Sequence, residues 1–225
     1  MHLRGCVGAA FGPELLGQGQ VMHAMLLRTL VCLRCCGAPG TIVSAALVLA
    51  FAPPAGGFEL IGGDWSFRNP ARMGPFFFCS ENAPAGAWQT IRAAASKWSS
   101  GKFAISFAEG DCPKCEEWTY VRFAALGDPN KTAETSFVNE PNTKKMTKCV
   151  ITFNSTKSWN VGMGNPSAGQ NDLFSVALHE FGHCVGVADV DTPNVVMSKS
   201  LPAGQTLRDL QPDDIAGRDA IYGAP

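Results

Sequence analysis

The chain has 225 residues, of which 46% are hydrophobic and 16% are charged, and its formal net charge is −1. This balance is typical of a packed globular domain and argues against a disordered chain, which carries fewer apolar residues and more charge. The low net charge gives no basic face of the kind that binds nucleic acid, so we expect no nucleic-acid partner.

The first 57 residues are predicted to be a leader and a linker rather than part of the folded domain. The run Thr41–Ala52 is apolar and 12 residues long, which is short for a membrane span but typical of the centre of a secretory signal. Arg28 and Arg34 precede this run. We therefore expect a secreted protein with one domain over residues 58–225. The alternative is an uncleaved leader that anchors the domain to a membrane.

Helices and strands alternate along the predicted domain, as in an α+β fold with a mixed sheet. Apolar residues at helical spacing predict a first helix over residues 85–99. Short apolar or alternating segments predict strands at residues 76–79, 103–107, 120–123 and 149–154. The polar segment 126–146 is predicted to be a loop.

Two further helices are predicted from their end signals. Asp172 is a favourable N-cap for a helix that carries an apolar face. Pro212, followed by two aspartates, favours the start of a last helix that Gly223 ends.

The nine cysteines are divided between the leader and the domain. The domain holds Cys79, Cys112, Cys115, Cys149 and Cys184. In an oxidising compartment the first four could form two disulfides, with three possible connectivities. Because Cys184 follows His183 in an apolar helix, we expect it to be a buried free thiol.

One short run carries most of the chemical information in the sequence. Only two histidines lie beyond residue 57, and they are the two ends of His179-Glu180-Phe181-Gly182-His183. Residues four apart lie on one face of a helix, so both imidazoles can bind one zinc ion. Glu180 can accept a proton from a water at the metal, as the general base of a metalloprotease does. A chance match on an ordinary amphipathic helix is the alternative.

A third protein ligand in this domain cannot be a histidine, because none remains. Gly186 permits the sharp turn that ends the helix, and Asp189 follows at a distance that can return a carboxylate to the metal. The expected ligands are His179, His183 and Asp189. Asp191 is the alternative to Asp189. The added glycine and aspartate argue against a chance match.

From Val176 to Gly223 the chain resembles the metzincin zinc peptidases, and within them the matrixin-like group. That group has the pattern H-E-x-x-H-x-x-G-x-x-H, then a methionine turn and a final helix that ends in Leu/Ile-Tyr-Gly. Asn194-Val195-Val196-Met197 is similar to the turn, and Ile221-Tyr222-Gly223 to the helix end. Asp189 in place of the third histidine resembles the branch typified by the bacterial protease snapalysin.

The resemblance implies a metzincin-like zincin catalytic domain. Its expected parts are a mixed twisted β-sheet, an active-site helix, a methionine turn and a C-terminal helix. It also implies one catalytic zinc with Met197 beneath it. Gly186, at the end of the helix, is expected to support the site as well. No counterpart of the family's structural-zinc histidines is present, so we expect no second zinc. Whether calcium binds is left open.

We therefore expect a secreted, monomeric zinc endopeptidase that hydrolyses polypeptide substrates. The substrate would add as a strand beside an edge strand near residues 151–154, where Ile151, Phe153 and Asn154 would contact it. Residues 198–210 would shape the pocket beyond the scissile bond. The alternative is a non-catalytic secreted binding protein on a peptidase fold, against which the retained Glu180 argues.

Overall fold

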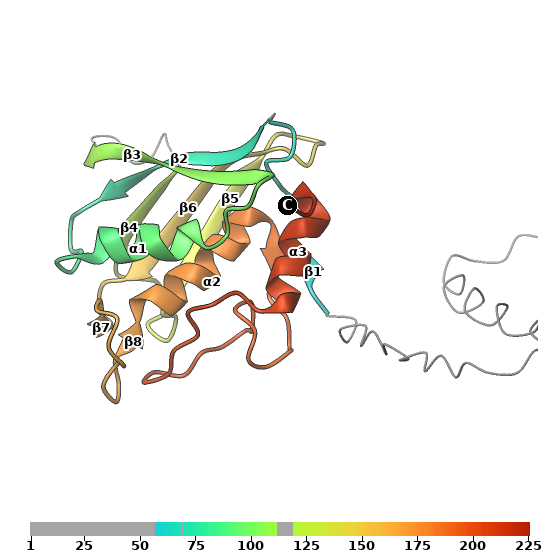
Figure 1. The fold of residues 1–225 in the computed structure, drawn as a ribbon. Coiled ribbons are helices and arrows are strands. Elements are labelled where there is room, and N and C mark those ends of the chain that lie inside the picture. The colour runs from blue at the N-terminus through green and yellow to red at the C-terminus, as the bar shows by residue number, and fades with distance from the viewer. Residues whose placement is uncertain (1–56, 69, 112–118) are drawn as a thin grey trace, which may run out of the picture. The chain divides into compact units, whose positions relative to one another are not determined.

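The computed structural model describes residues 57–68, 70–111 and 119–225 (Figure 1). The predicted leader, apart from residue 57, lies outside the described residues, as do Cys112 and Cys115. Within the described part of the chain, no helix combines the length and apolar character needed to cross a membrane.

A five-stranded mixed sheet forms one layer of the domain (Figure 1). The order across the sheet is β3-β2-β4-β6-β5, and only β5 runs antiparallel to its neighbour. The predicted α+β class is therefore confirmed. The strands are β2 (Ala71–Cys79), β3 (Phe103–Asp111), β4 (Tyr120–Ala124), β5 (Ala133–Asn139) and β6 (Met146–Asn154).

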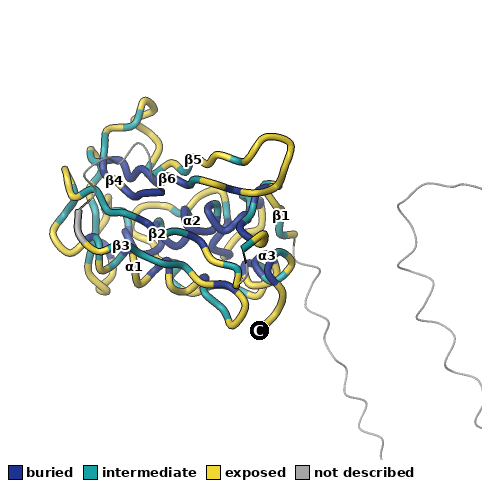
Figure 2. The backbone as a smooth tube through the Cα atoms, turned by 90° about the horizontal axis from the view of Figure 1, so that it is seen from above, coloured by how far each residue is buried: buried dark blue, intermediate teal, exposed yellow. Residues whose placement is uncertain are grey.

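The expectation that residues 151–154 form an edge strand is wrong. They belong to β6, which pairs with β4 on one side and with β5 on the other. The side chains of Ile151, Phe153 and Asn154 are fully buried. Their nearly continuous apolar run is typical of an interior strand. The edge strand on this side of the sheet is β5, which lies within the segment predicted to be a loop. Figure 2 shows its exposed and half-buried residues beside the buried residues of β6.

The described part of the domain also contains three helices. They are α1 (Ala87–Ser96), α2 (Leu173–Val185) and α3 (Pro212–Tyr222). Helices α1 and α2 lie side by side on one face of the sheet (Figure 1), where the indole nitrogen of Trp98 donates to the Leu178 carbonyl at 2.7 Å. The rings of Phe76 and Phe181 meet edge to face between the sheet and α2.

Two short strand pairs frame α2. Strand β7 (Trp159–Asn160) pairs in parallel with β8 (Asn171–Asp172), which leads directly into the helix. Strand β9 (Val187–Ala188) follows the helix and pairs antiparallel with β1 (Glu59–Leu60). The position of α2 is therefore fixed by strand pairing at both of its ends.

The sequence signals at both ends of α2 act as predicted. The Asp172 side chain caps the helix by accepting from the Ser175 backbone N–H at 3.0 Å. Gly186 ends it in the left-handed conformation, with φ of 116°. A Cβ on this residue would lie 2.7 Å from the Gly63 carbonyl oxygen, so the position requires glycine both for its conformation and for its space.

Cys184 is not the free thiol that we expected. It forms a disulfide with Cys149, with a Cα–Cα distance of 5.7 Å, and both residues are fully buried. The prediction failed because β6 passes beneath α2, which brings together two cysteines that are 35 positions apart in the chain. Cys79 is also disulfide-bonded. Two of the domain's five cysteines are thus assigned as a pair that joins the centre of the sheet to α2.

Replacing both members of this pair, as Cys149→Ala/Cys184→Ala, should lower the free energy of unfolding by about 3 to 4 kcal/mol. The physical reason is that the cross-link closes a long loop and so restricts the unfolded chain. Urea unfolding of the variant beside the unaltered protein measures the difference. A change of less than about 0.5 kcal/mol, with the same urea dependence, would contradict the prediction.

The long segment between Met197 and α3 is fastened to the start of α2 by Arg208. The guanidinium forms an ion pair with the buried Asp172 carboxylate, in which Nε lies 2.9 Å from Oδ2. Its other nitrogens donate to the carbonyls of the glycine-rich segment 162–164. The Ser175 hydroxyl also accepts from the Leu207 N–H at 2.8 Å. Burial acts to raise the pKa of Asp172, but hydrogen bonds from Arg208 and Ser175 outweigh it and hold the pKa below its ordinary value.

Arg208→Met should lower the free energy of unfolding at pH 7 by about 3 kcal/mol, because it leaves a buried carboxylate without its cation. The pKa of Asp172 is depressed in the folded protein, so its stabilising contribution is present above about pH 4 and is lost as the pH falls further. The difference between the two proteins should therefore shrink below about pH 4.

Urea unfolding at pH 7, 5 and 3 tests this dependence. Lys97→Met is the matched control, because it breaks the exposed ion pair with Asp209 and should cost less than about 1 kcal/mol. A loss for Arg208→Met that is equally small at pH 7, or unchanged at pH 3, would show that the buried pair does not behave as described.

Candidate metal centre

Helix α2 presents His179 and His183 on one face, and backbone carbonyls fix both rings. The Nδ1 atom of His179 lies 2.8 Å from the Val196 carbonyl oxygen, and that of His183 lies 3.0 Å from the Val187 carbonyl oxygen. A carbonyl can only accept, so each Nδ1 carries a proton and donates it. The lone pair of each Nε2 is then free for a metal ion, which is the arrangement that metal-binding histidines typically have.

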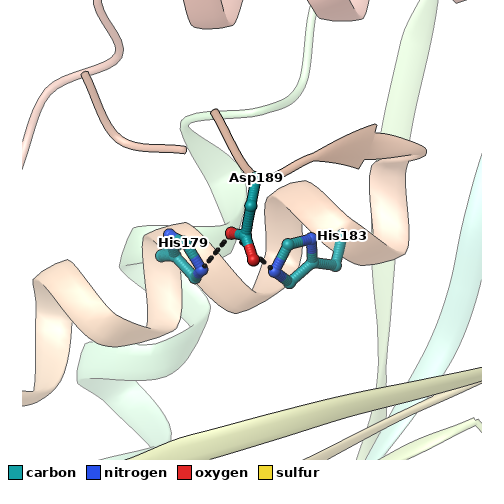
Figure 3. Close-up of side chains that lie close together, drawn as sticks. All are labelled: His179, His183 and Asp189. Atoms are coloured by element: carbon teal, nitrogen blue, oxygen red, sulfur yellow. Dashed lines mark ion pairs between the residues drawn. The ribbon is translucent and has the colours of Figure 1, made fainter. Parts of the chain in front are cut away.

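Asp189 returns to these rings immediately after β9. Its Oδ1 atom lies 3.2 Å from Nε2 of His179 and 3.4 Å from Nε2 of His183 (Figure 3). Ligands about 2.0 Å from a tetrahedral zinc ion are about 3.3 Å from one another, so these separations fit one ion. Within the described ranges, these three residues form the cluster of His, Cys, Asp or Glu side chains that lie close enough together to hold a metal ion.

The electrostatics of the group also suit a cation. Oδ1 of Asp189 is buried and accepts no hydrogen bond of good geometry from the described residues, and a buried oxygen of this kind is costly unless a partner satisfies it. Burial, then the neighbouring His179, lowers the pKa of His183.

The alternative ligand, Asp191, is engaged elsewhere. Its carboxylate forms an exposed ion pair with Lys199, with 2.7 Å between Oδ1 and Nζ. The structure therefore brings His179, His183 and Asp189 together and leaves Asp191 outside the group. Ile151, Phe153 and Asn154, which were expected to bind substrate, are buried in the interior of the sheet instead.

A cleft of about 490 Å³ opens over the group. One wall is residues 130–135, which include the first part of β5, and the other is formed by residues 195–196, 198–201 and Leu207. The three possible ligands and Glu180 also line it. Glu180 is only 6% exposed, and one of its carboxylate oxygens accepts a hydrogen bond from the Thr135 hydroxyl at 2.5 Å. Sequence reasoning missed Thr135, because it lies in the segment predicted to be a loop.

The predicted methionine turn lies against α2. Asn194 has a positive φ of 60°, and the Ser198 N–H then closes a turn onto the Val195 carbonyl at 3.1 Å. The Met197 side chain is buried and contacts the helix at Gly182. A Cβ on Gly182 would collide with Met197 and would lie 2.7 Å from the ring of Trp98, so only glycine fits here.

Asp214 in α3 holds the methionine turn from the other side. Its carboxylate accepts from the backbone N–H groups of Val196 and Met197, both at 3.0 Å, and from that of Gln211 at 2.8 Å. Burial raises the pKa of Asp214 even though these three donors act to lower it. The sequence had indicated only a favourable charge at the start of the helix. Its role as an anchor becomes visible only when α3 is placed beside the turn.

Comparison with known proteins shows a similarity that extends well beyond the run from His179 to His183. The family model for the matrixins, a peptidase family designated M10, matches residues 86–223. Human matrix metalloproteinase-16 is 38% identical over 74 residues, which are 32% of this chain and 12% of that protein. Human neutrophil collagenase is 40% identical over 72 residues, or 32% of this chain and 14% of the relative.

A plant protein, metalloendoproteinase 2-MMP of Arabidopsis thaliana, is 38% identical over 53 residues, which cover 24% of this chain and 14% of the relative. The matched regions thus span only about an eighth of the curated relatives' own lengths. The family model, by contrast, runs from the start of α1 to the end of α3, which is more than half of the chain. On that basis, this protein belongs to the matrixin family of metallopeptidases.

Proposed function

We propose that this protein is a zinc-dependent endopeptidase that hydrolyses peptide bonds with a water activated by Glu180. The observation that carries the proposal is the position of one Asp189 oxygen, 3.2 and 3.4 Å from the two Nε2 atoms, which is the separation expected of two ligands on one tetrahedral ion. His179, His183 and Asp189 would hold the zinc. When bound, zinc would polarise the scissile carbonyl and acidify a water molecule.

The residues around the metal group have separate tasks in this proposal. Glu180 accepts a proton from the attacking water and returns it to the leaving amine. The carbonyls of Val196 and Val187 keep both Nδ1 atoms protonated and thereby fix the direction of each Nε2. Met197 fills the space beneath the helix without offering a competing charge.

The substrate would lie along β5 rather than along β6. Among the described residues, strand β5 is paired only on its β6 side, so its other edge can hydrogen-bond an extended peptide as an added strand. The cleft wall opposite carries Val195, Leu201 and Leu207, and Val176 lies on the helix side. These side chains suit an apolar residue of the substrate.

The buried disulfide supports the proposal that the protein acts outside the cell. A disulfide such as Cys149–Cys184 forms and persists in oxidising compartments. The apolar run that was predicted to be a secretory signal is consistent with the same route. We therefore extend the proposal to a secreted peptidase.

Glu180→Ala should reduce kcat/KM on a quenched fluorescent peptide by at least about 100-fold, because the water loses its proton acceptor. The variant should still bind zinc, since Glu180 is not among the three ligands. Asp191→Ala serves as the matched acidic control and should retain activity. Equal activity in Glu180→Ala and the unaltered protein would refute the peptidase and leave the non-catalytic binding protein as the explanation.

The ligand set is tested by the metal content of the purified protein. We expect one zinc per chain by elemental analysis, and a loss of affinity of at least about 10-fold in Asp189→Ala, because two neutral imidazoles alone hold zinc weakly. Asp191→Ala should keep the full zinc content. Full retention in Asp189→Ala, or loss in Asp191→Ala, would assign the third position to another residue.

A further inference from the structure

We propose that Thr135 is a positioning residue for the general base Glu180. The inference rests on the proposed function, since it concerns how the base is oriented. It is carried by a contact between two residues that are 45 positions apart in the chain, one on the edge strand β5 and the other on helix α2.

The distance between the Thr135 hydroxyl and the Glu180 carboxylate is that of a strong, charge-assisted hydrogen bond. Its Oγ1 atom is 2.5 Å from Oε2 of Glu180 and 3.3 Å from the Glu180 backbone carbonyl oxygen. A hydroxyl has one proton to donate, and O–H···O⁻ bonds are typically about 2.5 to 2.7 Å long. The proton therefore goes to the carboxylate, and the hydroxyl determines where Oε2 lies.

The strand directs Thr135 toward the helix. Side chains alternate along β5, so Thr135 is half-buried whereas its neighbours Glu134 and Ser136 are exposed. Opposite Thr135 in the ladder is Ile151 of the interior strand, which fixes the register. The hydroxyl thus reaches Glu180 from a strand whose backbone is paired with β6, rather than from a loop.

This contact leaves the rest of the carboxylate available for chemistry. Glu180 is buried. Among the described residues, Thr135 is the one whose side chain donates a hydrogen bond to its carboxylate. A glutamate side chain has several rotatable bonds, and an anchor on Oε2 removes most of that freedom. The other oxygen, Oε1, is then presented in one orientation, which is the kind of preorganisation that raises the rate of a chemical step.

A purely structural role would also pair the buried oxygen, but it predicts different kinetics. If the hydroxyl only satisfies Glu180, its loss affects the stability of the fold. If it positions the base, its loss lowers kcat, leaves KM nearly unchanged, and has no effect once the base itself has been removed. The two roles are therefore separable by experiment.

The test compares Thr135→Val, which keeps the shape but removes the hydroxyl, with Thr135→Ser, which keeps the hydroxyl. We expect kcat on a fluorogenic peptide to fall about 10-fold in the valine variant, with KM within about twofold and full zinc content, and to return to within about twofold in the serine variant. The control is Thr147→Val on β6, whose hydroxyl donates to the Val138 carbonyl at 3.1 Å away from the cleft. Its kcat should match that of the unaltered protein.

Adding Thr135→Val to Glu180→Gln should cause no further loss if the hydroxyl acts through the base. An unchanged kcat in Thr135→Val, a rise in KM alone, or an equal loss in the serine variant would overturn the inference. If the valine variant does not fold, Thr135→Ala and Thr135→Ser decide the question: kcat must be lower in alanine, and equality overturns the inference. Equal activity in Glu180→Ala and the unaltered protein is a different result, because it removes the proposed function and this inference with it.

Discussion

The hydrogen bond from Nδ1 of His179 to the Val196 carbonyl is the contact on which the site depends. It joins helix α2, which carries the two histidines, to the methionine turn, and Asp214 holds that turn to α3 through two backbone N–H groups. An imidazole without this acceptor could rotate or change its protonated nitrogen, and Nε2 would no longer face Asp189. The orientation of one ring is thus set by a carboxylate in a helix that never touches the metal group.

Helix α2 is also constrained by contacts that tolerate few substitutions. Gly182 admits Met197 and Trp98, Cys184 is bonded to the central strand β6, and Gly186 turns the chain against Gly63. Arg208 and Asp172 fasten the opposite wall of the cleft to the first turn of the helix. These contacts arise from packing and backbone conformation. Together they explain why α2, the methionine turn and the segment that carries Arg208 lie against one another.

Local signals in the sequence predicted what local physics controls. Helix spacing placed His179 and His183 on one face, an N-cap and a glycine marked the ends of α2, and Asp189 was the nearest acid able to return. The predictions failed where the structure depends on pairing between segments that are far apart in the chain. The polar β5 is stabilised by pairing with β6, so its composition resembled that of a loop, and Cys184 found Cys149 only through the path of β6 beneath α2. Thr135 was missed for the same reason.

In the proposed function, the free edge of β5 would serve both substrate recognition and catalysis. The strand that would pair with an incoming peptide also carries the hydroxyl that restrains Glu180. A peptide that aligns fully with the edge would stiffen the strand and hold the base steady, whereas a poorly matched one would leave both less ordered. Selectivity between sequences would then be expressed in the speed of bond cleavage as well as in affinity, which is a form of induced fit built into a single strand.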